Sequence, residues 1–491
     1  MCETHTAVLF FVGDRAYKVK KPVDLEFLDF STVAARRAGC EREVALNRRF
    51  APDVYLGVGE FRGPDTEVPE PVVVMRRMPA GRRLSRLVRE GAPVDDALRA
   101  VARLLAARHA NAPRRAEVDR QGTRDALSAR WEASFAQVRA MSGGGTGPDG
   151  VAETERLVRR YLVGRERLFD ARIAQGRIVD GHGDLLAEDI FCLDDGPRVL
   201  DCLEFDDALR HVDGLDDAAF LAMDLEQLGA ADAAAFFLAA YGEYSGDPAP
   251  PSLRHHYVAY RAFVRAKVSL IQARQGAPGA ETAAHRLIAA TLRHLRASVV
   301  GVTLVGGLPG SGKSTLSGAL ADRLGVTLLS SDRLRKELAG IPVEQSAAAA
   351  YGEGLYTPEW TARTYAALLD RASALLSRGE SVVLDATWHD AGQREAALRM
   401  AERAHADLVA LHCQVPGATS AARLATRASG ASDADVGVAT AMAAAERPWP
   451  KAVTVDTSGS LEAAVARALA AVRPYDADRA PVFRAPPAEP G

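Results

Sequence analysis

Long apolar runs are missing from this 491-residue sequence, and no stretch is long enough to span a bilayer. Residues 1–5, Met-Cys-Glu-Thr-His, lack the basic and then apolar layout of a secretory signal peptide. The five cysteines are scattered, odd in number and without the spacing of metal ligands, which is typical of reduced, buried thiols. We therefore expect a cytoplasmic protein with no membrane partner.

Neither sign of charge is in excess, because 61 Lys and Arg face 64 Asp and Glu, for a net charge of −3. This balance gives no bulk attraction to nucleic acid, so a nucleic-acid partner is possible but not favoured. Internal repeats are also absent. The chain is too long for one hydrophobic core, so two or three domains are expected, and the oligomeric state is not predictable.

The first half of the sequence changes from a strand-rich pattern to a helical one. Two strands, 7–12 and 15–22, flank a turn at Gly13-Asp14. Ser31 can cap a helix that runs to Phe50. Further strands are expected at 54–61, 71–78 and 176–180, with helices over most of 94–170 and up to about 296. This order predicts an α+β domain over residues 1–297, with a sheet-based small lobe at about 1–80 and a helical lobe at about 81–297.

The second half alternates strand and helix, which predicts an α/β domain at 298–472 with a parallel sheet flanked by helices. The strand candidates are 302–305, 327–329, 382–386, 408–415 and 453–455. Residues 473–491 are rich in Pro, Ala and charge, and we expect them to form a disordered tail.

A complete phosphate-binding loop, G-x-x-x-x-G-K-[ST], lies between a predicted strand and a predicted helix. Its glycines allow backbone N–H groups to curl around phosphate oxygens at the N-terminus of the helix. Lys313 would reach the outer phosphates and the Ser314 hydroxyl would bind Mg²⁺. ATP and Mg²⁺ are therefore the expected cofactors of this loop, which consists of Gly307, Leu308, Pro309, Gly310, Ser311, Gly312, Lys313, Ser314 and Thr315.

A second group of chemistry-bearing residues lies in the first half. His182-Gly-Asp184 is followed by Asp189 and then by Asp201 on an apolar strand. This spacing resembles the catalytic loop and metal-binding strand of the aminoglycoside phosphotransferase family, relatives of protein kinases. The resemblance implies a bilobal kinase-like fold in which Asp184 is the catalytic base, Asp189 and Asp201 bind Mg²⁺, and His182 braces the loop. The family usually has Asn at the position of Asp189.

The same resemblance implies a phosphate-binding lysine on a strand of the small lobe and a glutamate on its helix. Lys18 and Lys20 share one face of their strand because side chains alternate, and we prefer Lys18. Glu43 is the best partner, with Glu41 as the alternative. No G-x-G-x-x-G loop covers the phosphates, which is also similar to the aminoglycoside phosphotransferases.

Acidic residues are frequent from Asp206 to Glu226, and we interpret this stretch as helix caps and solvated charge rather than a wall for a cationic substrate.

Beyond the phosphate loop, Asp332 and Arg335 form an Asp-x-x-Arg pattern after the second strand. This pattern resembles the acceptor site of polynucleotide-kinase-like and zeta-toxin-like P-loop kinases, which implies a general base at Asp332 and an acceptor contact at Arg335. Asp385, at the end of a buried strand, occupies a Walker B-like position suited to Mg²⁺. Arg423 and Arg427, one helical turn apart, resemble lid arginines of such kinases, and Arg394 is a weaker candidate.

Taken together, the chain resembles bacterial fusions of an aminoglycoside-phosphotransferase-like domain with a P-loop ATPase or kinase domain. We expect a bifunctional ATP phosphotransferase in which each half transfers the γ-phosphoryl group to a hydroxyl acceptor. Sugars and aminoglycosides are the expected acceptors of the first half, and small molecules, nucleotides or polynucleotide 5′-hydroxyls those of the second. The alternative is a P-loop ATPase switch fused to a ligand-sensing pseudokinase.

Overall fold

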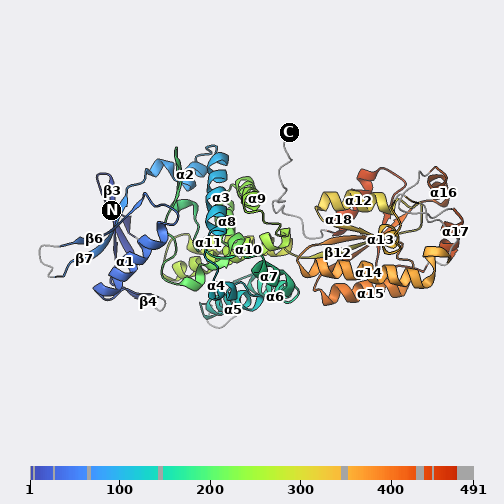
Figure 1. Cartoon of the computed structure of the whole chain (residues 1–491), viewed down its shortest axis with the longest axis horizontal. Helices are drawn as coiled ribbons and strands as arrows, with labels where there is room; N and C mark the ends of the chain where they lie inside the picture. The colour runs from blue at the N-terminus through green and yellow to red at the C-terminus, as the bar shows by residue number, and fades with distance from the viewer. Residues whose placement is uncertain are drawn as a thin grey trace.

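The computed structural model describes residues 2–3, 6–25, 28–62, 68–141, 148–343, 345, 352–426, 436–444 and 447–472. The molecule is elongated (Figure 1): an antiparallel sheet lies at one end, helices fill the middle, and a parallel sheet lies at the other end. The expected tail at 473–491 lies outside the described residues. Among the described helices, none combines the length and the apolar composition that crossing a bilayer requires.

The N-terminal sheet has five antiparallel strands in the order β1-β2-β3-β7-β6, with helix α1 packed against β6 and β7. The expected turn joins β2 to β3, and Gly13 there has φ 57°, a left-handed conformation that suits glycine. The elements are β1 (Cys2–Glu3), β2 (Ala7–Val12), β3 (Arg15–Lys20), β4 (Asp24–Leu25), β5 (Leu28–Asp29), α1 (Val33–Asn47), β6 (Tyr55–Phe61) and β7 (Glu70–Arg76).

The start and end of helix α1 differ from the expectation that Ser31 caps a helix running to Phe50. Thr32 is the N-cap, because its backbone is extended and its side chain accepts a hydrogen bond from the Ala35 N–H at 3.1 Å. The Ser31 N–H instead donates to Asp29 at 2.8 Å. The helix ends at Asn47 and the chain turns before Phe50.

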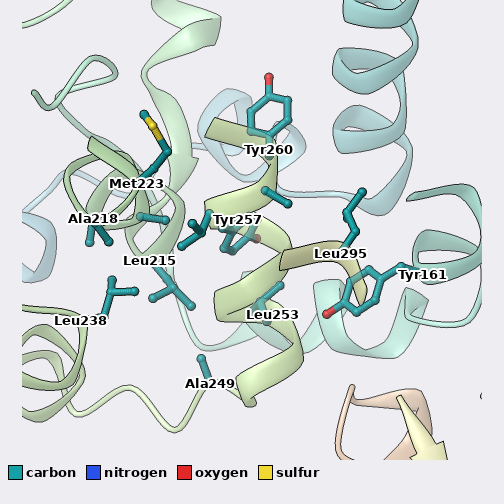
Figure 2. Packing of buried hydrophobic residues seen from close by; sticks show 14 of the residues in the cluster. Tyr161, Leu215, Ala218, Met223, Leu238, Ala249, Leu253, Tyr257, Tyr260 and Leu295 are labelled. Carbon is teal, nitrogen blue, oxygen red and sulfur yellow. The ribbon is translucent and has the colours of Figure 1, made fainter. Parts of the chain in front are cut away.

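The middle of the molecule is mainly helical and packs around α10, the longest of its described helices. Figure 2 shows buried side chains from α8 and α10 meeting there, among them Leu215, Met223 and Tyr257. The elements are η1 (Ala80–Arg82), α2 (Leu84–Arg89), α3 (Asp95–Ala110), α4 (Ala116–Arg120), α5 (Arg124–Met141), α6 (Val151–Val163), α7 (Glu166–Ala174), β8 (Ile178–Asp180), η2 (Ala187–Asp189), β9 (Ile190–Leu193), β10 (Gly196–Val199), η3 (Asp207–Leu209), β11 (His211–Asp213), α8 (Gly214–Gln227), α9 (Ala231–Ser245), α10 (Pro251–Arg274) and α11 (Ala280–Ala297).

A buried histidine in this core makes stability depend on pH. His256 accepts a hydrogen bond from the Trp131 indole N–H at 3.3 Å and stacks on Tyr161, and burial lowers its pKa to about 3. The native state therefore keeps His256 neutral, while the unfolded chain protonates below about pH 6.5. The stabilising contribution of neutral His256 is therefore fully present above about pH 6.5 and is lost as the pH falls towards 3.

We expect His256→Gln, which keeps a hydrogen-bond acceptor, to reduce this acid sensitivity. Urea unfolding at pH 7 and pH 5 should show that the variant loses about 2 kcal/mol less free energy of unfolding than the parent over this interval. The exposed His285 gives the control, because His285→Gln should leave the pH dependence unchanged. An equal pH dependence in parent and His256→Gln would show that His256 is protonated in the native state.

The C-terminal sheet confirms the predicted parallel α/β domain. Its five strands lie in the order β13-β14-β12-β15-β16, and all neighbours are parallel. Helices α12 and α18 cover one face, and α14 and α15 cover the other (Figure 1). The elements are β12 (Gly301–Gly306), α12 (Lys313–Leu324), β13 (Thr327–Ser330), α13 (Ser331–Leu338), η4 (Gly354–Tyr356), α14 (Pro358–Ser377), β14 (Val382–Asp385), α15 (Ala391–Arg403), β15 (Asp407–Gln414), α16 (Gly417–Ala425), α17 (Val436–Ala444), β16 (Val453–Asp456) and α18 (Leu461–Val472).

The helical middle and the C-terminal domain share one apolar core across their junction. Ser252, at the start of α10, donates to the Gly379 carbonyl at 2.6 Å, and Arg165 donates to the Ala404 carbonyl at 2.8 Å. A Cβ on Gly164 would come within 2.6 Å of the Ala404 carbonyl oxygen, so the two backbones approach closely. The predicted domain boundary near residue 297 stays a prediction.

Candidate active sites

Two lysines and one glutamate form the centre of the first candidate site. The alternation of β3 places Lys18 and Lys20 on the same face, towards α1. The Nζ of Lys18 lies 2.9 Å from Glu43 Oε1, and the Nζ of Lys20 lies 2.8 Å from Glu43 Oε2. The Glu43 side chain is fully buried. Each carboxylate oxygen of Glu43 therefore has its own lysine.

Asp201 joins this group from the segment after β10. Lys18 Nζ donates to Asp201 Oδ1 at 2.6 Å, and this lysine lowers the pKa of Asp201. Asp201 has φ 62°, a left-handed conformation that is strained for a residue with a Cβ, and its N–H donates to the Tyr55 hydroxyl at 3.1 Å. The structure thus brings together Lys18, Glu43 and Asp201, which lie far apart in the sequence. Their predicted roles in phosphate and metal binding stay predictions.

The segment that carries His182 and Asp184 is fixed through its backbone. The N–H groups of His182 and Gly183 each donate to the Asp217 carboxylate at 2.8 Å. The His182 ring is buried, and its Nε2 lies 3.0 Å from the Leu200 carbonyl oxygen. Burial lowers the pKa of His182. A neutral, buried ring suits the predicted bracing role and not proton transfer with a substrate.

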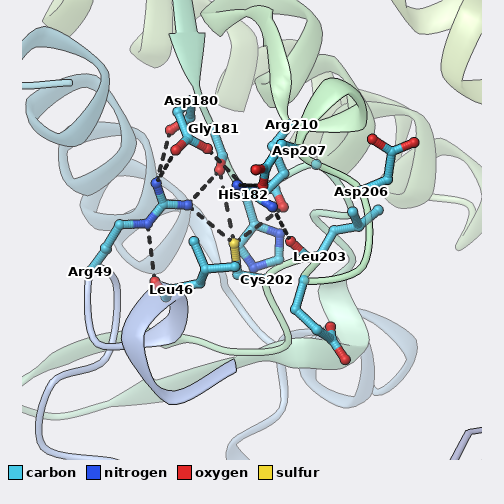
Figure 3. Close-up of polar contacts among 12 residues, drawn as sticks. Leu46, Arg49, Asp180, Gly181, His182, Cys202, Leu203, Asp206, Asp207 and Arg210 are labelled. Carbon is cyan, nitrogen blue, oxygen red and sulfur yellow. Dashed lines mark hydrogen bonds and ion pairs between the residues drawn. The ribbon is translucent and has the colours of Figure 1, made fainter. Parts of the chain in front are cut away.

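Figure 3 shows a second set of contacts around His182, in which Arg49 and Arg210 tie neighbouring segments together. Arg49 donates to the Gly181 carbonyl at 2.9 Å and to Cys202 at 3.4 Å. Arg210 donates to Asp180 at 2.9 Å. Arg49 also donates to the carbonyl of Leu46 on α1 at 3.1 Å, so the loop before Asp184 and the segment after Asp201 are held to each other and to the end of this helix.

Three carboxylates are close enough to affect one another. Burial raises the pKa of Asp184 to about 6, with Arg265 opposing this shift and Asp201 adding to it. Burial, together with Asp201 and Asp184, raises the pKa of Asp189 well above its usual value. Such a concentration of carboxylate oxygens fits a hard cation such as Mg²⁺, which takes one or two carboxylates, water and substrate phosphates.

Within the ranges described above, no three His, Cys, Asp or Glu side chains converge as a preformed metal site. The metal roles of Asp189 and Asp201 in the first half, and of Ser314 and Asp385 in the second, therefore stay predictions.

The sequence analysis did not identify Asp217, the residue that fixes the backbone of the loop carrying His182 and Asp184, because it interpreted the surrounding acidic stretch as solvated. That interpretation is wrong for the acids at the start of α8. Asp213, Asp216 and Asp217 are buried and pair with Arg172, Arg261 and His109, respectively. Asp213 does cap α8, accepting from the Leu215 N–H at 2.9 Å. The apolar run at 218–223 makes the helix apolar on all sides, and this pattern could have indicated burial.

The backbone conformation of the phosphate-binding loop, in the second candidate site, requires glycine at three positions. Gly307, Gly310 and Gly312 have φ of 142°, 80° and 81°, conformations that residues with a Cβ rarely adopt. A Cβ on Gly310 would also come within 2.7 Å of the Ser420 carbonyl oxygen. The loop leads from β12 directly into α12, so its backbone N–H groups lie at the N-terminus of that helix.

The predicted magnesium-binding carboxylate lies beside this loop. Asp385 ends β14, and its register partner on the adjacent strand β12 is Val305. Its Oδ1 is buried and has no hydrogen-bond partner among the described residues. Burial raises the pKa of Asp385, while Lys313 and Ser314 lower it and Asp332 raises it, so these four side chains lie close together. An orphaned buried carboxylate oxygen next to the Ser314 hydroxyl fits an Mg²⁺ ligand.

Arg335 has a structural contact in addition to its predicted acceptor role. Its guanidinium is buried, donates to the Leu355 carbonyl at 2.6 Å and lies 4.8 Å from the Tyr356 ring centroid. The N-cap of α13 is Ser330, so Asp332 is not the capping residue. Arg335 thus fixes the segment at η4, and its contact with an acceptor stays a prediction.

Arg423 lies beside Gly312 of the phosphate-binding loop, and its role as a lid arginine stays a prediction. Its Nη2 donates to the Thr457 carbonyl at 2.8 Å, and its Nη1 lies 3.2 Å from the position of a Cβ on Gly312. Arg427 lies outside the described residues. Arg394 lies on α15 with its guanidinium 5.3 Å from the Trp449 ring centroid.

A protein-family model matches part of the second half. Residues 302–450 match the protein-family model described as "AAA domain". Among solved structures, a sugar kinase from Janibacter sp. covers 35% of this chain and 94% of that chain, with 19% identity and a TM-score of 0.28. A gluconokinase from Sinorhizobium meliloti covers 36% of this chain and 92% of that chain, with 22% identity and a TM-score of 0.27.

Two relatives match almost the whole chain. They are the uncharacterized protein Rv2004c of Mycobacterium tuberculosis and the uncharacterized protein Mb2027c of Mycobacterium bovis. Each is 43% identical over 466 residues, which cover 95% of this chain and 94% of the relative. The match therefore spans both halves, and the chain belongs to the family of these mycobacterial proteins.

Proposed function

We propose that the chain is a cytoplasmic, Mg²⁺-dependent ATP phosphotransferase with one site in each half. The observation that carries the proposal for the first half is the ion-pair group of Lys18, Glu43 and Asp201. A lysine oriented by a helix glutamate, next to a metal-binding aspartate, is the arrangement that kinase-like phosphoryl transfer requires. The fold and motif of the second half support a P-loop kinase.

In the first half, Asp184 accepts the proton of the acceptor hydroxyl. Its pKa of about 6 leaves the carboxylate ionised at neutral pH, as a general base must be. Lys18 binds the α- and β-phosphates and is oriented by Glu43. Asp189 and Asp201 would hold Mg²⁺, which neutralises phosphate charge when bound. The backbone contacts from Asp217 keep the loop that carries Asp184 in place.

In the second half, backbone N–H groups of the loop from Gly307 to Gly312 cradle the phosphates, and Lys313 reaches the outer ones. Ser314 and Asp385 would hold Mg²⁺. Asp332 acts as the general base for the acceptor hydroxyl, with Arg335 nearby. Arg423, and Arg427 after it in the sequence, stabilise the transferred phosphoryl group.

The acceptors belong to one chemical class, hydroxyl compounds. Small molecules such as sugars or aminoglycosides suit the first half. Small molecules, nucleotides or a polynucleotide 5′-hydroxyl suit the second, where the near-neutral charge of the whole chain disfavours the polynucleotide.

A second candidate function is a P-loop ATPase switch joined to a ligand-sensing pseudokinase. Two features of the sequence favour it: Asp189 stands where the aminoglycoside phosphotransferases have Asn, and the small lobe at about 1–80 has no G-x-G-x-x-G loop. The direct contact of Lys18 with Asp201 also occupies two groups that phosphate and metal would need.

Calorimetric titration of the full chain with Mg²⁺ and the non-hydrolysable analogue AMP-PNP separates the two candidates. The two-site proposal predicts two equivalents of nucleotide per chain, falling to one in a Lys313→Ala variant. A single equivalent, lost completely in Lys313→Ala, would contradict nucleotide binding by the first half and favour the pseudokinase.

A further inference from the structure

We propose that Lys20 is a positioning residue of the first site, which holds Glu43 and the segment after Asp201 so that Lys18 is left for the nucleotide phosphates. This inference rests on the proposed function of the first half. Kinase-like chemistry calls for one lysine paired with the helix glutamate. Here two lysines share that glutamate, and the second one needs an explanation.

The contacts of Lys20 link three separate parts of the chain. From strand β3, its Nζ lies 2.8 Å from Glu43 Oε2 on helix α1. The same Nζ lies 2.8 Å from Glu204 Oε1, three residues after Asp201. The Lys20 side chain is 2% exposed, Glu43 is fully buried and Glu204 is 14% exposed. This burial distinguishes the bridge from a surface ion pair, which would contribute little.

Contacts with neighbouring residues restrict the position of the Lys20 side chain. Its Nζ lies 4.8 Å from the Phe30 ring centroid. Gly39 on α1 leaves the space that Phe30 and Lys20 fill, because a Cβ there would come within 2.7 Å of Phe30 and 3.2 Å of Lys20 Cε. Arg42 on α1 also donates to the Glu204 carbonyl at 2.8 Å, so the segment after Asp201 is held from two positions on this helix.

The balance of charge around the two lysines explains how Lys20 keeps Lys18 available to nucleotide phosphates. Lys18 and Lys20 face the three carboxylates of Glu43, Asp201 and Glu204. Without Lys20, Glu43 and Glu204 would lie close together with Lys18 as the nearest counter-charge, and buried charges of this kind interact strongly. Lys18 would then be bound more tightly by protein carboxylates and would be less available to nucleotide phosphates.

The test uses the full chain carrying Lys313→Ala, so that the first site is the one left to bind nucleotide. Lys20→Gln in this background should weaken Mg²⁺·AMP-PNP binding roughly tenfold or more. Adenosine, which has no phosphates, should bind with unchanged affinity. A purely structural role would weaken both ligands together, so the comparison isolates the effect on phosphate binding.

Arg36→Gln is the matched control, because Arg36, on α1, is also mostly buried and pairs with Glu70 at 2.5 Å. It should leave AMP-PNP affinity within about twofold while removing a comparable ion pair. If Lys20→Gln does not fold, Glu204→Gln should strengthen AMP-PNP binding roughly threefold without affecting adenosine, because one carboxylate fewer then competes with phosphate for the two lysines. Weaker AMP-PNP binding in Glu204→Gln would overturn the inference.

The outcomes separate the inference from the proposed function. If the Lys313→Ala parent binds no AMP-PNP, the proposed nucleotide site of the first half is wrong, and the inference with it. If the parent binds AMP-PNP and Lys20→Gln binds it within twofold, the inference alone is overturned. It is also overturned if Lys20→Gln weakens adenosine and AMP-PNP equally.

Discussion

Asp184→Asn is expected to lower phosphoryl transfer by the first half by a factor of ~10²–10⁴, the usual contribution of a general base. Asparagine has nearly the same shape but cannot accept the acceptor proton. Nucleotide binding should persist, because Lys18, Glu43 and Asp201 are unchanged. Initial rates with γ-labelled ATP and an acceptor of the first half, beside AMP-PNP calorimetry, would measure both quantities.

Asp195→Asn provides the matched control for this substitution. Asp195 belongs to the same lobe, its side chain is 65% exposed, and it pairs with Arg198 three residues away. An exposed pair of this kind contributes little to stability, so the control should retain the parent rate. If Asp184→Asn and Asp195→Asn transferred phosphate equally well, Asp184 would not be the base.

Lys313→Ala is expected to lower turnover by the second half by roughly 10²–10³, because it removes a preorganised positive charge from the developing charge on the phosphates. Lys313 is buried beside Asp385 and begins α12, so its position is set by the loop and the helix together. ATP consumption with an acceptor of the second half would give the rate, and transfer by the first half should be unaffected.

Lys451→Ala is the control for Lys313→Ala, since Lys451 is exposed and lies in the same domain. It should leave both activities unchanged. Retention of full second-half turnover in Lys313→Ala would show that the phosphate-binding loop does not take part in transfer, whatever the first half does.

The sequence was most informative where structure is local. The phosphate-binding loop is nine consecutive residues whose glycines dictate the backbone, and the alternating strands and helices around it predicted the parallel sheet. The shared face of Lys18 and Lys20 followed from the two-residue period of a strand. Glu43 was the preferred partner in the sequence, and the structure places its carboxylate between both lysines.

Contacts between distant segments were less predictable. Nothing near His182 indicates that Asp217 accepts two N–H groups from its loop, because that contact depends on how α8 packs. The contact of Arg335 with Leu355 likewise depends on where the chain before α14 returns to α13. Whether Lys18 or Lys20 faces Asp201 is decided by the position of the segment after β10, which strand periodicity does not determine.

The most direct test of the two-site account is transfer from γ-labelled ATP with Mg²⁺ to a panel of sugars, aminoglycosides, nucleosides and 5′-hydroxyl oligonucleotides. The parent, Lys313→Ala and Asp184→Asn would be assayed side by side. The account predicts that each substitution lowers labelling of a different acceptor by about a hundredfold or more, while the other acceptor is labelled as in the parent. It is contradicted if Lys313→Ala removes all transfer and Asp184→Asn removes none, or if the parent labels no acceptor in the panel.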